Sequence, residues 1–571
     1  FTLKGFSADI ANFVSLSGDL GFAKTGTDIV AVGSNVTAAL SAGTSASLRL
    51  SSASFGLRSG AAGTTAFELA NGTLTASVDG LGNLKATSVA VQYTGTAGAV
   101  TAGTKVSVGS QSYTFSQAIA ANTVAFSLKG FSADIANFVS LSGDLGFAKT
   151  GTDIVAVGSN VTAALSAGTS ASLRLSNASF GLRSGAAGTT AFELANGTLT
   201  ATVDGLGNLK ATSVAVQYTG TAGAVTAGTK VSVGSQSYTF SQAIAANTVA
   251  FTLKGFSADI TNFVSLSGDL GFAKTGTDIV AVGSNVTAAL SAGTSASLRL
   301  SNASFGLRSG AAGTTVFELA NGTLTASVDG LGNLKATSVA VRYTGASASV
   351  TAGTKLSVGS QSYTFSQAIA ANTVAFTLKG FSADIANFVS LSGDLGFAKT
   401  GTDIVAVGAN VTAALSAGTS ASLRLSNASF GLRSGAAGTT AFELANGTLT
   451  ASVDGLGNLK ATSVAVQYTG TAGAVTVGSK VSVGSQSYTF SQAIAANTVA
   501  FTLKGFSADI ANFVSLSGDL GFAKTGTDIV AVGSNVTAAL SAGTSASLRL
   551  SNASFGLRSG ATGTTAFELA N

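Results

Sequence analysis

The chain has 571 residues and a net charge of +5, from 29 Lys and Arg against 24 Asp and Glu, and it contains no Pro, Cys, Met, Trp or His. Cys and His are the usual ligands of zinc, iron and copper, and they also supply thiol nucleophiles and imidazole bases. The composition therefore excludes most types of metal centre and most acid–base catalysis. We expect no enzyme, no catalytic residue and no cofactor, with calcium as the one alternative left open.

The charge and hydropathy patterns argue against two further classes of partner. A nucleic-acid surface needs clustered Lys and Arg with stacking aromatics, whereas Lys4, Lys24, Arg49, Arg58 and Lys85 are spread singly. The mean hydropathy is +0.46, yet Ala, Gly, Ser and Thr interrupt every apolar stretch before the ~18 residues of a membrane helix. We expect no nucleic-acid binding and no membrane span in this sequence.

A long repeat organises the chain. The segment that starts at Phe1 returns with minor changes at Phe126, Phe251, Phe376 and Phe501, which gives a period of 125 residues. The predicted domains are residues 1–125, 126–250, 251–375 and 376–500, with a partial fifth repeat at 501–571. Because the copies are nearly identical and the last one stops in mid-repeat, we expect the sequence to be a window from a longer array.

Within a repeat, apolar residues alternate with small or charged ones, as in a strand with one buried face. The first repeat predicts short strands at 14–16, 30–32, 48–50, 67–69 and 89–91, with second strands at 20–22, 36–38, 55–57 and 74–76. A glycine closes each of the first four units, at Gly26, Gly43, Gly60 and Gly80. Only residues 117–121 have the pattern of a helical turn.

These units of about 16 to 22 residues favour an all-β fold in which each unit is one coil of a β-solenoid rod. In that arrangement successive coils stack in parallel and cover each other's apolar faces. The hypothesis places Phe13, Phe22, Phe55 and Phe67 in the interior. It also places Arg49 and Glu68 side by side on the outer surface, because they are one coil apart.

The alternative is a string of antiparallel β-sandwich domains. Asn71-Gly72 is a hairpin signal between two apolar stretches, and residues 109–111 form a second. Against it, the chain has no proline and no polar linker, since residues 122–125 continue directly into Phe126 as a strand. Residues 96–121 fit the coil pattern worst and are expected to form a hairpin that projects from the rod.

Two sets of polar residues are candidates for binding or modification. Isolated aspartates lie near predicted turns, where turn capping is favoured over calcium, which collects several oxygen ligands at once; they are Asp9, Asp19, Asp28 and Asp79. Glycosylation sequons begin at Asn35, Asn71 and Asn177. We interpret these asparagines as corner residues.

The run FVSLSGDLGFAKTGTDIVAVGSNVTAALSAG from Phe13, with LSNASFGL and FELANGTLTA, resembles the repeat arrays of giant bacterial surface and secreted proteins. These are of the adhesin or filamentous-haemagglutinin-like type with β-solenoid arrays. The resemblance lies in repeat style and composition and carries over no functional residue. It implies export, extracellular rods and sometimes calcium, although the GGxGxD nonapeptide of calcium-binding β-rolls does not occur here.

From these observations we expect a structural protein at the cell surface or outside the cell, forming a stiff β-rich rod within a fibre, sheath or stalk. Such a rod gains stability as repeats are added, and its partners are expected to be further copies of itself. The alternative is the repeat stalk of a large adhesin, which presents a binding domain located outside this sequence.

Overall fold

The computed structural model describes residues 1–79, 82–136, 138–168, 170–204, 207–260, 263–293, 295–311, 313–329, 332–455, 457–541, 543, 546–560 and 565–570. Within these ranges the protein is all-β, as predicted, and no segment is helical. The chain divides into two compact units, each of which is described by itself. Unit 1 comprises Phe1–Thr261, Leu266–Ala281 and Ser357–Gln361, and unit 2 comprises Asn262–Ser265, Val282–Leu356 and Ser362–Asn571.

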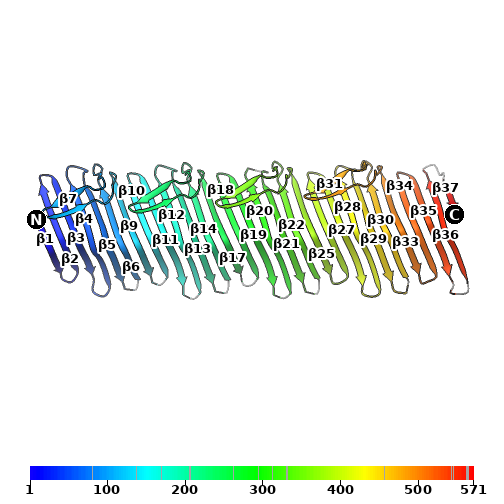
Figure 1. The fold of residues 1–571 in the computed structure, drawn as a ribbon, viewed down its shortest axis with the longest axis horizontal. Helices are drawn as coiled ribbons and strands as arrows, with labels where there is room; N and C mark the ends of the chain where they lie inside the picture. The colour runs from blue at the N-terminus through cyan, green and yellow to red at the C-terminus, as the bar shows by residue number, and fades with distance from the viewer. Residues whose placement is uncertain are drawn as a thin grey trace. The chain divides into compact units, whose positions relative to one another are not determined.

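Each complete repeat supplies six long strands followed by a short two-stranded hairpin (Figure 1). Repeat 1 contains β1 (Thr2–Ile10), β2 (Val14–Thr25), β3 (Asp28–Ser41), β4 (Ala46–Ser59), β5 (Ala66–Val78), β6 (Gly82–Thr94) and the hairpin β7 (Lys105–Val108) and β8 (Gln111–Thr114). Repeat 2 contains β9 (Thr123–Ile135), β10 (Val139–Thr150), β11 (Asp153–Ala167), β12 (Ala171–Ser184), β13 (Ala191–Val203), β14 (Gly207–Thr219), β15 (Lys230–Val233) and β16 (Gln236–Thr239).

The same order continues along the chain. Repeat 3 contains β17 (Thr248–Ile260), β18 (Val264–Thr275), β19 (Asp278–Ala292), β20 (Ala296–Ser309), β21 (Val316–Val328), β22 (Gly332–Thr344), β23 (Lys355–Val358) and β24 (Gln361–Thr364). Repeat 4 contains β25 (Thr373–Ile385), β26 (Val389–Thr400), β27 (Asp403–Ala417), β28 (Ala421–Ser434), β29 (Ala441–Val453), β30 (Gly457–Thr469), β31 (Lys480–Val483) and β32 (Gln486–Thr489). The partial repeat contains β33 (Thr498–Ile510), β34 (Val514–Thr525), β35 (Asp528–Ser541), β36 (Ser547–Ser559) and β37 (Thr565–Ala570).

Within each unit the long strands pair in sequence order, and the pairings of the described strands are antiparallel. In unit 1, β1 to β6 pair consecutively and β6 then pairs with β9 across the hairpin. In unit 2, β22 pairs with β25 and β30 with β33 in the same way. The all-β class and its repetitive character are therefore confirmed, but the described strands pair antiparallel and do not form the parallel coils of the solenoid hypothesis. Each unit of 16 to 22 residues is one strand with its turn, and the next strand runs back.

The two short strands predicted in each unit are halves of one long strand. Residues 30–32 and 36–38 both belong to β3, and residues 48–50 and 55–57 both belong to β4. The polar break between them is a left-handed backbone position, at Asn35 with φ 50° and at Ser52 with φ 57°. Asn71, with φ 62°, holds the same place in β5, so Asn71-Gly72 lies inside a strand and the hairpin predicted there is wrong.

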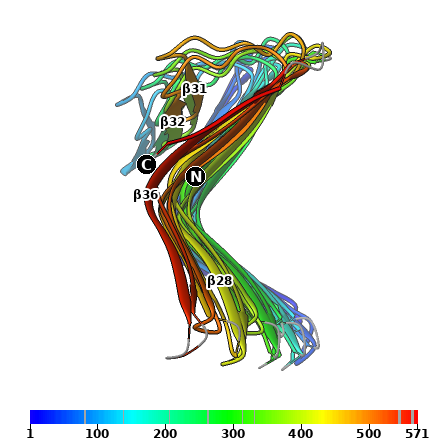
Figure 2. The same ribbon diagram turned by 90° about the vertical axis from the view of Figure 1, so that its right-hand side faces the viewer.

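Each long strand bends near its middle, as Figure 2 shows in side view. The bend coincides with a slip in the alternation of apolar residues, because β6 carries Leu84 and Ala86 before it and Val89, Val91 and Tyr93 after it. The register of β5 against β6 shifts at the same point, which is the effect of a β-bulge. With one extra residue at the bend, the apolar side chains of both halves point to one side of the sheet, here called the inner face.

The hairpins cover the upper half of the opposite side, here called the outer face (Figure 2). The hairpin at 109–111 is confirmed, since β7 pairs with β8. Its flanking residues Val100 and Ile119 form an isolated bridge where a helical turn was predicted. The hairpin does not project freely: Phe115 is 1% exposed and packs with the strand residues Val32 and Ala66 in one apolar cluster.

The phenylalanines are less buried than the coil hypothesis requires. Phe13 lies at a strand turn and is 56% exposed, and Phe22 on the inner face is 36% exposed. Phe55 and Phe67 are half-buried on the same face, with ring centroids 6.2 Å apart. A sheet covered on one face by hairpins leaves the other face open, whereas stacked coils would have enclosed these rings.

Candidate binding site

The deepest polar group of repeat 1 is the Glu68 carboxylate, which lies between β5 and the hairpin. Glu68 is 1% exposed. Its Oε2 accepts hydrogen bonds from the Tyr113 hydroxyl at 3.0 Å and the Ser116 backbone N–H at 2.8 Å. Its Oε1 accepts from the Ser116 hydroxyl at 2.7 Å and from Gln92 Nε2 at 2.9 Å. Four donors thus satisfy a carboxylate that burial would otherwise make costly.

The fold explains this arrangement locally. Glu68 alternates with the inner-face residues Phe67 and Leu69, so it points to the outer face. Gln92 lies directly opposite it on β6. The Tyr113 ring reaches the carboxylate by lying over Gly56 of β4, where a methyl group would clash with the ring. Glycine at this position is what lets the hairpin approach the sheet.

Electrostatics couple the tyrosine to the glutamate. Burial raises the pKa of Tyr113, and the negative charge of Glu68 and the hydrogen bond to it raise this pKa further. In repeat 4, burial alone would raise the pKa of Glu443, but hydrogen bonds from Ser491, Gln467 and Tyr488 outweigh burial and bring the pKa below its ordinary value. In repeat 4 the cluster therefore holds an ionised Glu443 carboxylate next to the neutral phenol of Tyr488.

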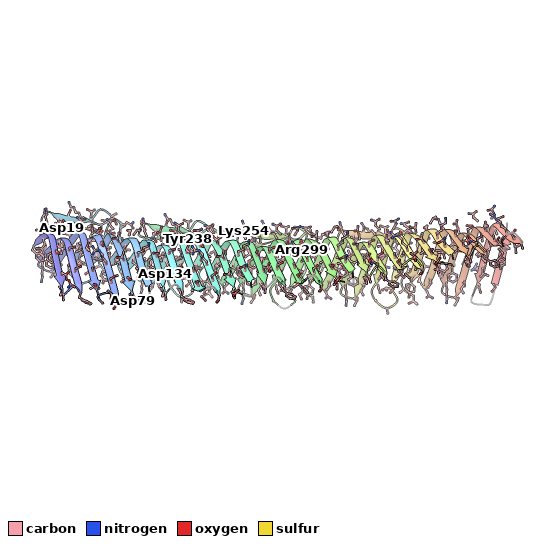
Figure 3. All side chains as sticks on the ribbon, turned by 90° about the horizontal axis from the view of Figure 1, so that it is seen from below. Asp19, Asp79, Asp134, Tyr238, Lys254 and Arg299 are labelled. Carbon is pink, nitrogen blue, oxygen red and sulfur yellow. The ribbon has the colours of Figure 1, made fainter. Side chains whose placement is uncertain are left out.

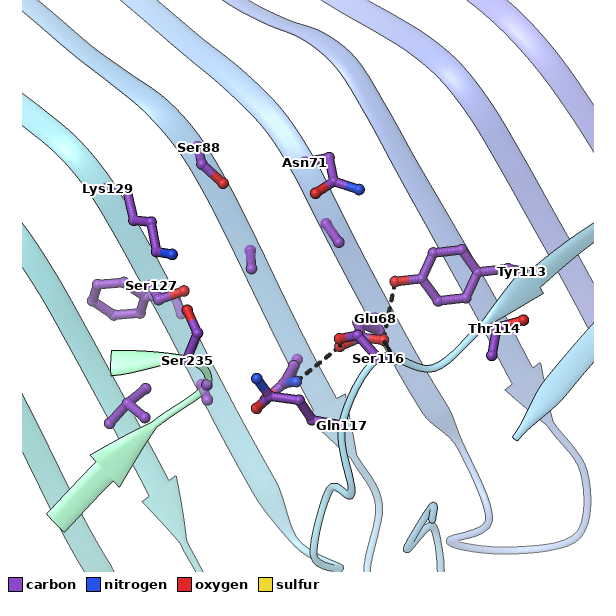
Figure 4. A pocket seen from close by; sticks show the side chains of 17 residues that line it. Glu68, Asn71, Ser88, Tyr113, Thr114, Ser116, Gln117, Ser127, Lys129 and Ser235 are labelled. Atoms are coloured by element: carbon purple, nitrogen blue, oxygen red, sulfur yellow. Dashed lines mark hydrogen bonds between the residues drawn. The ribbon is translucent and has the colours of Figure 1, made fainter. Parts of the chain in front are cut away.

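A cavity of about 290 Å³ opens beside Glu68 on the outer face. It lies between the hairpin of repeat 1, the strands β5, β6 and β9, and the turn of the next hairpin. Figure 4 shows Lys129 and Ser235 across this space from Glu68. Repeat 2 has an equivalent cavity of about 320 Å³, lined by Glu193, Gln217 and Lys254 and closed by Gly359 and Ser360. Both cavities lie within unit 1.

The cluster recurs with one change. Repeats 2 and 4 reproduce it with Glu193 and Glu443, each bonded to the equivalent Tyr, Ser and Gln. In repeat 3 the glutamine is replaced by Arg342, whose Nε donates to Glu318 Oε1 at 2.9 Å. Arg342 is only 7% exposed and Glu318 is fully buried, so repeat 3 holds a buried ion pair where the others hold a neutral donor.

The prediction that Arg49 and Glu68 lie side by side is wrong. Arg49 pairs opposite Thr75 in the other half of the strand, where it is exposed and donates to the Ser51 hydroxyl. Glu68 pairs opposite Gly56 and lies under the hairpin. The two residues are on adjacent strands, but antiparallel pairing brings together residues at mirrored distances from the turn, so a spacing of one unit does not make them neighbours.

The predicted aspartates lie apart from the Glu68 cluster. Asp9 caps its turn by accepting from the Asn12 N–H at 2.9 Å, as predicted, and Asp19 accepts from the Gly5 N–H at 2.8 Å. Asp28 is the first residue of β3 and pairs opposite Thr25 of β2. Asp79 lines a shallow cleft among the lower turns with Asp134, away from Asp19 in Figure 3. Among the described residues, Asp and Glu side chains form no group of three that could hold a metal ion.

The sequon asparagines occupy special backbone positions. Asn35, Asn71 and Asn177 all have positive φ, at 50°, 62° and 56°. Each lies at the bend of a long strand, and asparagine tolerates this left-handed conformation better than most residues. This placement agrees with their interpretation as corner residues, although the corner is a bend within a strand.

The sequence did not predict the Glu68 cluster. Its members come from residues 24 to 48 positions apart in the chain, and no local motif links them. One signal was available: Glu68 is an acidic residue within an otherwise apolar stretch and recurs as Glu193, Glu318 and Glu443. Its hydrogen-bond partners Ser116 and Tyr113 lie in the segment that fitted the coil pattern worst.

No protein-family model matches the chain, and no curated protein matches its sequence. In the part of the chain that the structure describes, no helix is long and apolar enough to cross a membrane.

Proposed function

We propose that this protein is a structural, non-catalytic element of the cell surface or the extracellular space, in which repeats extend a β-sheet within a fibre, sheath or stalk. The observation that carries the proposal is the backbone pairing between repeats. The last long strand of repeat 1, β6, pairs with β9 over ten residue pairs from Gly82 opposite Ile135 to Tyr93 opposite Val124. The same junction recurs between β22 and β25 in unit 2.

A junction of this kind supports a structural role because it repeats without a linker. The boundary between residues 125 and 126 falls inside β9, so two repeats share one strand. At about 4.8 Å per strand, six strands widen the sheet by about 29 Å per repeat. Each further repeat adds the same hydrogen bonds and apolar contacts as the one before, as in other repeat proteins.

Self-association through the inner face is part of the proposal. The inner face exposes large apolar side chains in every repeat, among them Tyr93, Phe126 and Ile135 at 44%, 43% and 50%. Soluble proteins rarely leave large contiguous apolar patches uncovered. A second copy presents the same side chains at the same spacing, so we propose that copies cover one another's inner faces in a lateral assembly.

Electron microscopy of the purified chain tests the proposal, together with sedimentation over a range of protein concentrations. A fibre or sheath subunit is expected to form filaments or laterally associated bundles whose size grows with concentration. The adhesin-stalk alternative uses the same strand junctions, but it predicts monomers at every concentration. Separate compact particles whose size does not increase with protein concentration would rule out the fibre and the sheath and leave the stalk.

A further inference from the structure

Repeat 3 shows what a positive charge does beside the buried carboxylate. Arg342 stands where Gln92, Gln217 and Gln467 stand in the other repeats. Its Nε donates a hydrogen bond to Glu318 Oε1, the oxygen that accepts from the glutamine amide in the other repeats. The guanidinium continues to the turn of the next hairpin, where a methyl group built on Gly484 would lie 2.5 Å from Arg342 Nη1. One side chain thus spans the distance from the carboxylate to the following repeat.

In repeats 1 and 2 the same space is a cavity. In repeat 1 it is bounded by Glu68 on one side and by Gly234 with Ser235 on the other. These are the positions that the two ends of the Arg342 side chain reach in repeat 3. A volume of about 290 Å³ is roughly ten times the share of one water molecule in the liquid. This is enough for a small organic group, at the lower end of ligand-pocket sizes.

The chemistry of the lining favours a cation. The Glu68 carboxylate is buried and hydrogen-bonded entirely to neutral donors, from Gln92, Tyr113 and Ser116. The other charged residue of the lining is Lys129 on β9. Lys379 keeps this position in repeat 3, where the buried arginine is nonetheless accommodated. The hydroxyls of Ser88, Ser127 and Ser235 offer further acceptors around the space.

We propose that the cavities beside Glu68 and Glu193 bind a small organic cation with a guanidinium or amidinium group, in the place that the Arg342 side chain fills in repeat 3. The bound group donates to the glutamate oxygen now held by the Gln92 or Gln217 amide, which turns aside. Planar N–H donors match a carboxylate better than an ammonium point charge does. A ligand in this place also contacts the turn of the next hairpin and so links consecutive repeats.

Calorimetric titration of the full chain with methylguanidinium chloride tests the proposal, at constant ionic strength and with methylurea as the neutral probe of similar shape. We expect saturable binding of methylguanidinium and none of methylurea. The double variant Q92R/Q217R copies repeat 3 into repeats 1 and 2 and should remove two sites. The variant R342Q copies repeat 1 into repeat 3 and should add one site.

The variants Q92A and Q217A refine the test, because they free the glutamate oxygen and should bind methylguanidinium roughly tenfold more tightly. Circular dichroism checks that each variant folds. R342Q carries a residue natural to the other repeats, so it decides the question even if the double variant fails to fold. Equal binding of methylurea, or a site number unchanged in R342Q, would overturn the proposal.

Discussion

At the scale of single residues, the buried glutamate of each complete repeat joins the hairpin to the sheet. The partial repeat supplies a natural contrast, because Glu568 occupies the equivalent position in β37 and is exposed. The same residue type in the same sequence context is therefore buried in one repeat and open in another. In the complete copies the following long strand supplies a Gln or Arg donor and the hairpin supplies the Tyr and Ser donors that bury the glutamate, and this sequence contains neither segment after Glu568.

Replacing Glu443 by Gln should weaken the packing of the hairpin β31–β32 on the sheet. The new amide keeps one acceptor oxygen but turns an NH2 group toward donors of Ser491 and Tyr488. Leaving buried donors unpaired costs about 1–3 kcal/mol, so amide hydrogens of the hairpin should exchange faster by one to two orders of magnitude. Glu568→Gln is the matched control and should change nothing; equal effects at both positions would contradict this account.

The buried tyrosines predict an alkaline transition. Burial and the neighbouring glutamates raise the pKa of Tyr113, Tyr238, Tyr363 and Tyr488. The folded state thus retains protons that the unfolded state releases above about pH 10. The stabilisation is complete below that pH and is lost as the pH rises through the folded pKa. Ultraviolet titration of tyrosinate should show a late phase that coincides with loss of the hairpins, and replacing the four residues by Phe should remove it.

The bends give a prediction about backbone conformation. Ser52 has φ 57°, and the equivalent Asn177, Asn302, Asn427 and Asn552 have φ between 56° and 57°. Asn visits this left-handed region more readily than Ser, and an unfavourable residue there costs roughly 1–2 kcal/mol. Ser52→Asn should stabilise the β3–β5 region of repeat 1, and Asn177→Ser should destabilise repeat 2. Hydrogen exchange of β4 and β12 measures both, and changes of the same sign would refute the assignment.

At the scale of elements, the sequence predicted strands and turns well and their connection poorly. The alternation, the glycine at Gly26 and the hairpin at 109–111 are all present as predicted. The period of 16 to 22 residues does not tell a parallel coil from an antiparallel strand, because both bring apolar residues of successive units into rows. The slip of the alternation between Ala86 and Val89 was the available signal: it makes one bent strand with a continuous apolar face.

The cluster around Glu68 depends on a contact that no local pattern encodes. The strand alternation correctly predicted that Glu68 points away from Phe67 and Leu69, but its predicted place on the exposed surface is wrong, because the hairpin that buries it comes 45 residues later, at Tyr113. Placing a hairpin on one face of a sheet requires knowing which face it folds over. The small residue that permits the contact does not stand out in the sequence either, because Gly56 is one of 72 glycines.

Gly56 tests the packing of the hairpin as an element. A methyl group at Gly56 would clash with the Tyr113 ring, whereas at the equivalent Gly556 it would meet nothing within 4 Å. Gly56→Ala should displace the hairpin β7–β8 at a cost of about 1–3 kcal/mol, seen as faster proteolysis of residues 95–121. Gly556→Ala should leave the protein unchanged. A protected hairpin in the first variant would mean that Tyr113 does not lie over β4.

At the scale of the whole molecule, the two faces of the sheet have different chemistry. The outer face carries the hairpins on one half and Ser, Thr, Arg49 and Lys85 on the other, whereas the inner face is apolar along both halves of the strands. Because this asymmetry recurs in every complete repeat, an assembly of copies has one face suited to burial and one suited to water. The lateral association that we propose depends on this difference.

The exposed tyrosines of the inner face provide the test of that association. Tyr93, Tyr218, Tyr343 and Tyr468 are 43% to 45% exposed, one in each complete repeat, so the variant Y93K/Y218K/Y343K/Y468K places four charges on the inner face without opening a core. Burying an unpaired charge between copies costs several kcal/mol, and we expect the variant to remain monomeric where the parent chain assembles. The matched control S77K/T202K/S327K/S452K adds the same charges at exposed positions of the outer face and should assemble like the parent. Sedimentation of the three proteins at equal concentration makes the comparison; assembly lost only in the control would assign the contact to the outer face.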